Sequence, residues 1–325
     1  MLPLKRDVLD VKQLYAQLQS GQVRVVAQHP DTAASTSDAW DILSDKKKKL
    51  LDWTFNPNGE AQKIPLVCVS ATDNYLIEYF VEEEKFKLKR GQNPTVQEYF
   101  EKNRAFVETK AQELENKDTS VPKKSKTYYL NDALYELPVK HIKYFKISYA
   151  AGIYSYLGSK VVLDPNMEFG GRLMGASISG VTVYHGLNPL GFQFPKTMEK
   201  FLNKDNYYIN PTDMPVQTPG LVEINAYDTI LTELLFMEQF GTADKFKDPN
   251  DWLIREAYPF IAACVSALVS KGYLALYFPD TRMTKYMTPI QQYCTQFMKM
   301  QYVGVIGCAK SELNFVSAVL VWRKS

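Results

Sequence analysis

Histidine and cysteine are scarce in this chain of 325 residues. The few that occur are far apart in the sequence: His29, His141, His185, Cys68, Cys264, Cys294 and Cys308. Because no C-x-x-C pair and no His-rich cluster is present, we expect neither a metal site nor a disulfide framework. Scattered thiols are typical of a reducing compartment, so we expect an intracellular, cytoplasmic protein.

Long hydrophobic runs and a large excess of charge are also missing. No apolar stretch approaches the roughly 18–20 residues that a membrane span needs, and the first residues lack the apolar core of a signal peptide. A formal net charge of +2 predicts no strong general attraction to nucleic acid. Hydrophobic residues make up 46% of the chain and aromatic residues 13%, which is enough for a sizeable core and excludes wholesale disorder.

Two short basic runs stand out from this balance. They are Lys46-Lys47-Lys48-Lys49 and Lys123-Lys124-Ser125-Lys126. A solvated helix face and a solvated linker are the simplest interpretation. The alternative is a phosphate-contacting patch, through which the protein would bind nucleic acid.

The composition changes near residue 127. Before it, the patterns predict helices over 10–19, 38–53 and 95–117 and a short buried strand over 65–70. The polar segment 118–126, which contains Pro122, is the best linker candidate. We therefore expect an N-terminal, mainly helical region over 1–127 and a second domain over 128–325, with limited proteolysis cutting first in the linker.

Strands alternate with helices after residue 128. The predicted strands are 161–164, 182–187, 221–224 and 273–278, and the predicted helices are 141–157 (ended by Gly158), 172–179, 195–202, 229–240, 252–271 and 289–300. This alternation predicts an α/β, Rossmann-like doubly wound sheet. Two final strands, 302–308 and 315–322, have no helix between them and must pair antiparallel. A seven-stranded sheet with such a C-terminal hairpin is typical of the class I methyltransferase fold.

Residues 141–190 resemble a family of S-adenosylmethionine-dependent methyltransferases from phages and large DNA viruses. The family motif is V-L-D-P-S-A-G-W-G-[GD]-R-L-x-G-A, and this chain has V-L-D-P-N-M-E-F-G-G-R-L-M-G-A starting at Val162. The preceding F-K-I-S…I-Y-S-Y, starting at Phe145, is similar to the family's F-R-I-S…I-Y-x-Y-F. The Y-H-G-L-N-P that starts at Tyr184 resembles its Y-x-G-x-D-P-N. The resemblance implies a cofactor pocket formed by Asp164, Glu168, Gly170 and Asn188.

The departures from the family pattern fall at the chemical positions. Glu168 stands where the family has the glycine that lets the cofactor approach, and Asn188 stands where it has the acid that binds the ribose. Enzymes of this kind that methylate amino groups carry [DNS]-P-P-[YF] after the fourth strand. Here the matching stretch is Asn225-Ala226-Tyr227, without prolines. Asn225 would accept hydrogen bonds from the target amino group and Tyr227 would stack on the base, if the protein is active.

Each of these residues also has a purely structural interpretation. Asp164 can cap the next helix or bond the amides of its turn instead of a cofactor, and Arg172 can pair with a nearby carboxylate. Asn225 can be an ordinary polar residue at a strand end. Gly170 fits a tight turn whatever the ligand.

Three functional hypotheses follow. The first is a methyltransferase-like pseudoenzyme with degraded motifs, which binds no cofactor. It would serve as a scaffold or partner-binding subunit, as a homo-oligomer or with another protein, for example in a viral complex or particle. The second is an active enzyme that uses S-adenosylmethionine to methylate an amino group of a nucleic-acid base. The third is a non-enzymatic nucleic-acid binder that uses the basic runs.

Overall fold

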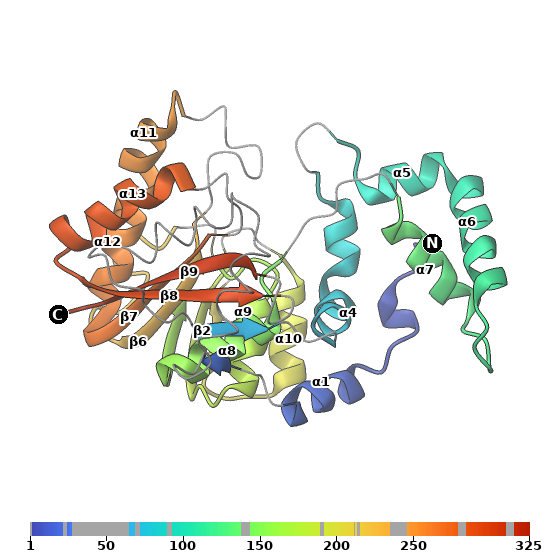
Figure 1. Ribbon diagram of the computed structural model, residues 1–325, viewed down its shortest axis with the longest axis horizontal. Helices are drawn as coiled ribbons and strands as arrows, with labels where there is room; N and C mark the ends of the chain where they lie inside the picture. The colour runs from blue at the N-terminus through green and yellow to red at the C-terminus, as the bar shows by residue number, and fades with distance from the viewer. Residues whose placement is uncertain are drawn as a thin grey trace, which may run out of the picture.

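A nine-stranded sheet runs through the computed structural model of this protein (Figure 1). The structure describes residues 2–21, 25–27, 65–68, 72–89, 93–137, 144–188, 192–210, 212, 215–234, 246–278, 284–309 and 315–325. The strands are β1 (Val25–Ala27), β2 (Pro65–Cys68), β3 (Val161–Asp164), β4 (Val183–Leu187), β5 (Tyr207–Asn210), β6 (Tyr227–Glu233), β7 (Leu268–Phe278), β8 (Gln301–Ala309) and β9 (Phe315–Arg323). Their order across the sheet is β1-β2-β8-β9-β7-β6-β3-β4-β5.

Seven of these strands confirm the predicted fold. From β5 through β4, β3 and β6 to β7 all neighbours are parallel, and β9 then pairs antiparallel with both β7 and β8. The protein therefore has an α/β, Rossmann-like sheet of the class I methyltransferase type, closed by the expected C-terminal hairpin. Residues 310–314 of the connecting turn lie outside the described residues.

The other two strands come from the N-terminal region. β2 pairs parallel to β8, with Val67 opposite Cys308, and β1 pairs antiparallel to β2. The strand predicted over 65–70 is confirmed for 65–68, whereas its partner at the far end of the chain was not predicted. The predicted helix over 38–53 lies outside the described residues.

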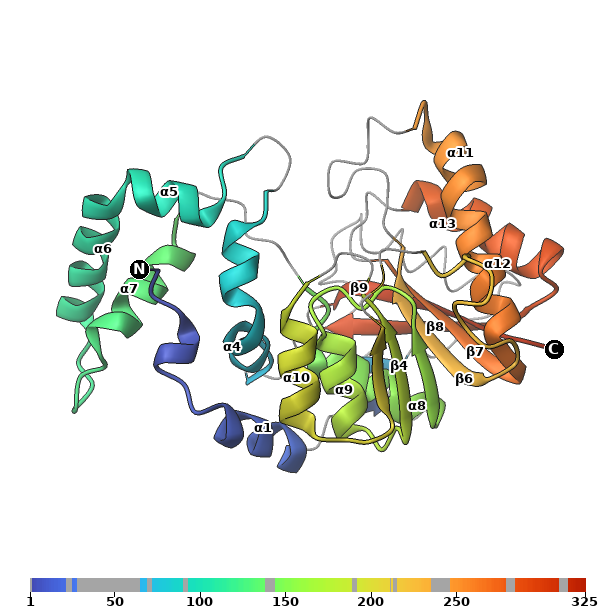
Figure 2. The same ribbon diagram turned by 180° about the vertical axis from the view of Figure 1, so that it is seen from behind.

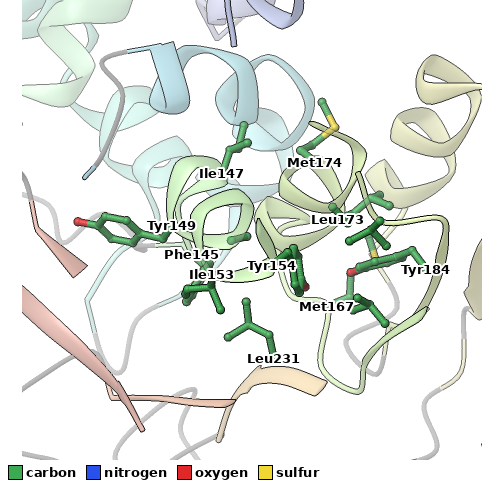
Figure 3. Close-up of a cluster of buried hydrophobic side chains, with 14 of the residues drawn as sticks. Phe145, Ile147, Tyr149, Ile153, Tyr154, Met167, Leu173, Met174, Tyr184 and Leu231 are labelled. Carbon is green, nitrogen blue, oxygen red and sulfur yellow. The ribbon is translucent and has the colours of Figure 1, made fainter. Parts of the chain in front are cut away.

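Alternate residues of the central strands face two different helical layers. Leu163, Ile230 and Leu274 belong to a core shared with α11 (Pro249–Trp252), α12 (Tyr258–Ala267) and α13 (Thr284–Gln292). The neighbouring residues Val162, Leu231 and Ala275 belong to a second core. That core is shared with α1 (Val11–Ser20), α4 (Thr72–Lys87), α8 (Ile147–Leu157), α9 (Gly171–Ile178) and α10 (Phe194–Leu202), as Figures 2 and 3 show. The two-residue period of a strand thus separates the layers.

The glycines of the family-like motif are explained by helix packing. A Cβ built on Gly171 would lie well inside van der Waals contact with the carbonyl of Phe145, and one built on Gly175 would collide with the Ala150 side chain. Small residues at these positions let α9 lie directly against α8. Gly158 ends α8 in the left-handed conformation (φ 66°), as predicted.

Three of the predicted elements differ from the structure. The helix predicted over 95–117 is two helices, α5 (Val96–Lys102) and α6 (Arg104–Lys117), because the chain leaves helical geometry at Asn103. The segment 221–224, predicted as a strand, is a turn with Ile224 71% exposed, and the helix predicted over 229–240 is replaced through residue 233 by β6. β6 is buried on both faces, so it lacks the alternation that marks a half-buried strand.

The helices before and after the predicted linker share a third core. α7 (Lys126–Tyr135) packs against α6, and this core includes Val107 of α6, Leu134 of α7 and Phe86 of α4. Between them, Asp118 accepts a hydrogen bond of 2.7 Å from the Tyr129 hydroxyl, which holds the pKa of this carboxyl at about 2. Packing thus joins the predicted linker to α7. That 1–127 and 128–325 form separate domains stays a prediction.

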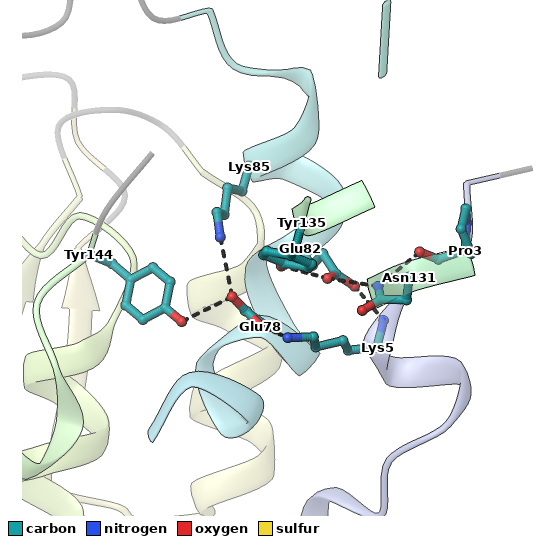
Figure 4. Close-up of polar contacts among 8 residues, drawn as sticks. All are labelled: Pro3, Lys5, Glu78, Glu82, Lys85, Asn131, Tyr135 and Tyr144. Atoms are coloured by element: carbon teal, nitrogen blue, oxygen red, sulfur yellow. Dashed lines mark hydrogen bonds and ion pairs between the residues drawn. The ribbon is translucent and has the colours of Figure 1, made fainter. Parts of the chain in front are cut away.

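A buried polar network ties the N-terminal segment to α4 and α7 (Figure 4). Glu78 accepts from the ammonium groups of Lys5 and Lys85 and from the Tyr144 hydroxyl. Glu82 accepts from the Asn131 amide at 3.1 Å and from the Tyr135 hydroxyl at 2.7 Å. Burial opposes ionisation of Glu78, yet the two ammonium groups outweigh it and hold its pKa below the ordinary value.

Candidate functional site

The strand order reverses between β3 and β6. The chain proceeds from β3 outward to β4 and β5, then returns to β6 on the other side of β3. Ligands of open α/β sheets bind beyond the carboxyl ends of the strands at such a reversal. The candidate site is therefore formed by the turn after β3, residues 165–170, together with the ends of β4 and β6.

An ion pair lies at the start of this turn. The Arg172 Nε atom is 2.9 Å from Oδ2 of Asp164, and the Tyr184 hydroxyl donates to the same oxygen at 2.6 Å. Arg172 also donates to the backbone carbonyl of Asn166. Both charged side chains are almost fully buried, at 1% and 0% exposure. The structural interpretation of Arg172 is thus confirmed, and Asp164 is bonded to the chain itself.

Glu168 occupies a conformation that favours glycine. Its φ is 46°, in the left-handed region that non-glycine residues adopt rarely. The residue is 6% exposed, and Oε2 lies 3.9 Å from Nη1 of Arg172. Burial, followed by repulsion from Glu233, raises the pKa of Glu168 to about 8. A strained residue and a perturbed carboxyl therefore coincide where the family motif has glycine.

This raised pKa predicts a pH-dependent stability. Since the pKa in the folded state lies above that in the unfolded chain, near 4.5, the native protein holds the extra proton between these values. The free energy of unfolding should therefore fall between about pH 4.5 and pH 8, by up to about 5 kcal/mol. Urea titrations at several pH values should show this slope in the wild type and lose most of it in Glu168→Gln. Glu101→Gln, at an exposed position, should keep it; an unchanged slope in Glu168→Gln would contradict the assignment.

The side chain of Asn188 is hydrogen-bonded to a nearby residue of the chain, Phe192. Its Nδ2 atom donates to the Phe192 carbonyl at 2.8 Å, and the residue is 1% exposed. The Phe192 ring is stacked on Phe169, at 5.2 Å between ring centroids, and Phe194 lies on the same ring. Gly170, with φ 74°, ends the turn and precedes α9. The structure thus brings Asp164, Glu168 and Gly170 together on one turn, and Asn188 to the neighbouring strand end.

Three buried polar atoms around this site have no hydrogen-bond partner within the described part of the chain. They are Oδ1 of Asn166, Nη1 of Arg172 and Oδ1 of Asn188. Because a buried polar group without a partner costs about 1–3 kcal/mol, such atoms call for a bound water or a ligand. The site therefore offers two acceptors and one donor beside the Glu168 carboxyl.

The structure places Asn225 and Tyr227 at the opposite edge of the sheet. β6 begins at Tyr227, so both residues lie at its amino end. There, Oδ1 of Asn225 accepts from the Lys324 ammonium at 2.9 Å, and the Tyr227 hydroxyl is 2.6 Å from Nδ1 of His185. The strand prediction that put them at the carboxyl end was wrong, and they are not brought together with the other candidate residues.

Glu233 is the residue that the sequence analysis missed. It ends β6, it is 7% exposed, and its carbonyl accepts from Nδ2 of Asn166 at 3.4 Å. A usable signal was present, because β3 and β6 are both short apolar runs that end on an acid. With the strand correctly placed, the stretch after it is Glu233-Leu234-Leu235-Phe236, which again has no prolines.

Three further expectations concern the two basic runs, a metal site and a membrane span. Lys123 donates to the Glu115 carbonyl and Lys124 to the Tyr128 hydroxyl, while 46–49 lie outside the described residues. Among the residues that the structure describes, no three His, Cys, Asp or Glu side chains gather as a metal site would require. In the same part, no helix has the length and apolarity to cross a membrane.

No family model matches the chain, and no curated protein matches it in sequence. Solved structures similar to it include methyltransferases. The 1,6-didemethyltoxoflavin-N1-methyltransferase of Burkholderia thailandensis, with S-adenosylhomocysteine bound, is 12% identical at a TM-score of 0.40, over 55% of this chain and 78% of its own. The magnesium protoporphyrin IX methyltransferase of Synechocystis PCC 6803, with S-adenosylmethionine bound, is also 12% identical at a TM-score of 0.40. The match covers 55% of this chain and 79% of that enzyme. The N-methyltransferase NodS of Bradyrhizobium japonicum WM9 is 9% identical at a TM-score of 0.39, over 53% and 91%.

Proposed function

We propose that this protein is a non-catalytic member of the methyltransferase fold that acts as a scaffold or partner-binding subunit. The observation that carries the proposal is Glu168. At the turn where a glycine would admit a cofactor, the chain has a larger side chain, buried and in contact range of Arg172. The resemblance of 141–190 to proteins of phages and large DNA viruses supports a viral complex as its setting.

The residues present do not fit S-adenosylmethionine. Glu168 fills space beside the turn, and Asn188 lacks the negative charge that would grip a ribose diol. Charge-assisted hydrogen bonds are about twice as strong as neutral ones, so this replacement weakens the contact. The Asn188 amide is moreover bonded to Phe192.

The carboxyl end of β6 supports the same conclusion. Glu233 could accept a hydrogen bond from a target amino group, but the residues after it lack the prolines that fix such a loop. Positioning of the reacting groups supplies a large part of the rate in group transfer. Without it, transfer to an amino group would be slow even if a cofactor bound.

A second candidate function is an active methyltransferase that acts on an amino group of a nucleic-acid base. It is favoured by the unpaired Oδ1 atoms of Asn166 and Asn188 and by the Glu168 carboxyl. Hydroxyl and ammonium groups of a cofactor would satisfy these acceptors.

Calorimetric titration with S-adenosylmethionine separates the two candidates. We expect no binding by the wild type at about 1 mM cofactor and measurable binding by Glu168→Gly/Asn188→Asp. A regained contact to a charged group is worth about 1.5–3 kcal/mol, or one to two decades in affinity. Asn206→Asp, which adds the same charge at an exposed position, is the matched control.

The second candidate predicts the reverse. Micromolar affinity in the wild type, with methyl transfer to single- or double-stranded DNA or RNA that Glu233→Gln abolishes, would establish the active enzyme and refute the proposal.

A further inference from the structure

A stack of aromatic rings ends at the surface beside the amino ends of the strands. The Tyr258 and Tyr293 rings are parallel within 12°, with centroids 4.2 Å apart, and Phe297 continues the stack at 5.9 Å and 23°. Phe297 is 73% exposed, and Ile254, one helical turn before Tyr258, is 64% exposed. The two exposed residues come from the π-helical turns η3 (Leu253–Ala257) and η5 (Tyr293–Phe297), and such turns occur often at functional sites.

Cationic residues gather at the same end of the molecule. Lys299 follows η5, and its carbonyl accepts from the Ser325 hydroxyl at 3.0 Å. Lys271 donates its amide to Lys324 and accepts from Nε of Arg323. In both overall views the C-terminus lies near α12 (Figures 1 and 2), and the Ser325 carbonyl accepts from the Ser270 hydroxyl at 3.1 Å.

Two of these cations are available to a ligand. Lys271 and Lys299 are exposed, and within the described part of the chain no carboxylate lies within ion-pair distance of either ammonium group. The Lys324 ammonium is used internally, by the carbonyls of Val265 and Leu268. The exposed acids Glu223 and Glu256 lie on neighbouring segments, so charge alone makes this only a mildly basic face.

We propose that Phe297, Lys271 and Lys299 form a binding surface for single-stranded nucleic acid. An exposed ring at the end of a parallel stack offers its face to an unpaired base, and the two exposed lysines at the same end of the molecule would contact its phosphates. A paired base cannot reach such a ring, because its faces are covered by its neighbours in the duplex. The surface lies at the amino edge of the sheet, opposite the candidate cofactor site, so it is independent of the proposed function.

Fluorescence anisotropy with a labelled 20-nucleotide oligothymidylate, at 50 and 200 mM salt, tests this surface. Removal of the ring in Phe297→Ala should weaken binding about tenfold, within the range for loss of one stacked base, and leave the salt dependence unchanged. Lys271→Glu/Lys299→Glu should weaken binding and reduce the slope of log affinity against log salt by about 1.4, since each phosphate contact on a single strand contributes about 0.7.

Two control variants distinguish an effect at this surface from a general effect of losing an exposed ring or of changing the net charge. Phe106→Ala removes another exposed phenylalanine, and Lys196→Glu/Lys200→Glu reverses two exposed lysines on α10; both should bind within twofold of the wild type. Unchanged affinity in Phe297→Ala, equal or tighter binding of the matching duplex, or no binding at 50 mM salt would each overturn the proposal. None of these outcomes bears on the titration with S-adenosylmethionine.

Discussion

Replacing Arg172 by methionine is expected to lower the free energy of unfolding by about 3–5 kcal/mol, the range for breaking a buried ion pair from one side. The substitution keeps much of the side-chain length and removes only the charged group. Asp164, which is fully buried, would then keep the Tyr184 hydroxyl and the Asn166 amide as partners. These two hydrogen bonds would not compensate the buried carboxylate, which has no access to water, for the loss of its cationic partner.

Urea denaturation at pH 7 measures this loss. Arg104→Met is the matched control, because Arg104 pairs with Glu108 on the surface, where both side chains are about half exposed. An exposed pair contributes about 0–1 kcal/mol, so the control should remain close to the wild type. The double variant Arg172→Met/Asp164→Asn should lose less free energy of unfolding than the sum of the losses in the two single variants. A cost below 1 kcal/mol for Arg172→Met would show that the ion pair does not hold the turn.

Replacing Glu78 by leucine should be about as destabilising, again by roughly 3–5 kcal/mol at pH 7. Glu78 is the partner of both Lys5 and Lys85, whose side chains are 11% and 3% exposed. Without it, the two ammonium groups would lose the carboxylate that both of them contact. Burial already lowers the pKa of Lys85, and the loss of Glu78 would lower it further.

The pH dependence separates this mechanism from a simple packing defect. When the folded-state pKa of a lysine lies below its value in the unfolded chain, the unfolded state holds more protons between the two values, and stability rises with pH. The difference in the free energy of unfolding between the wild type and Glu78→Leu should therefore become smaller as the pH is raised from 7 toward 10. Glu83→Leu, at a carboxylate that is 40% exposed and bonded to Arg6 and Lys87, should cost less than 1 kcal/mol. A deficit independent of pH would contradict the electrostatic explanation.

The sequence predicted those elements whose signals are local. β3 and β4 are short apolar runs next to turn residues, α8 ends at a glycine, and the absence of a helix before the last strand determined the direction of β9. β6 was missed because a strand buried on both faces has no alternation. The apolar residues of 221–224 belong to an irregular segment in which Leu221 and Val222 pack against the core and Ile224 is exposed. The pairing of β2 with β8 could not be predicted, because its two halves lie at opposite ends of the chain.

The candidate site was predicted to a similar extent. Position 168 was identified as out of place from its chemistry, and the structure adds that its backbone adopts the conformation of the glycine it replaces. Asp164, Arg172, Gly171 and Gly175 match the family motif and are accounted for by an ion pair and by close helix packing. These matching positions are thus explained by the fold. Glu233 could be identified as a site residue only once the end of β6 was known.

The position of β2 in the sheet has a consequence for how the chain is made. β2 emerges from the ribosome long before its parallel neighbour β8. At about 5–20 residues per second, the chain between Cys68 and Gln301 takes roughly 10–50 s to produce. Throughout that interval one edge of β2 has no strand to pair with, and such an edge can pair with another chain. This edge of the sheet can therefore be completed only after β8 has been synthesised.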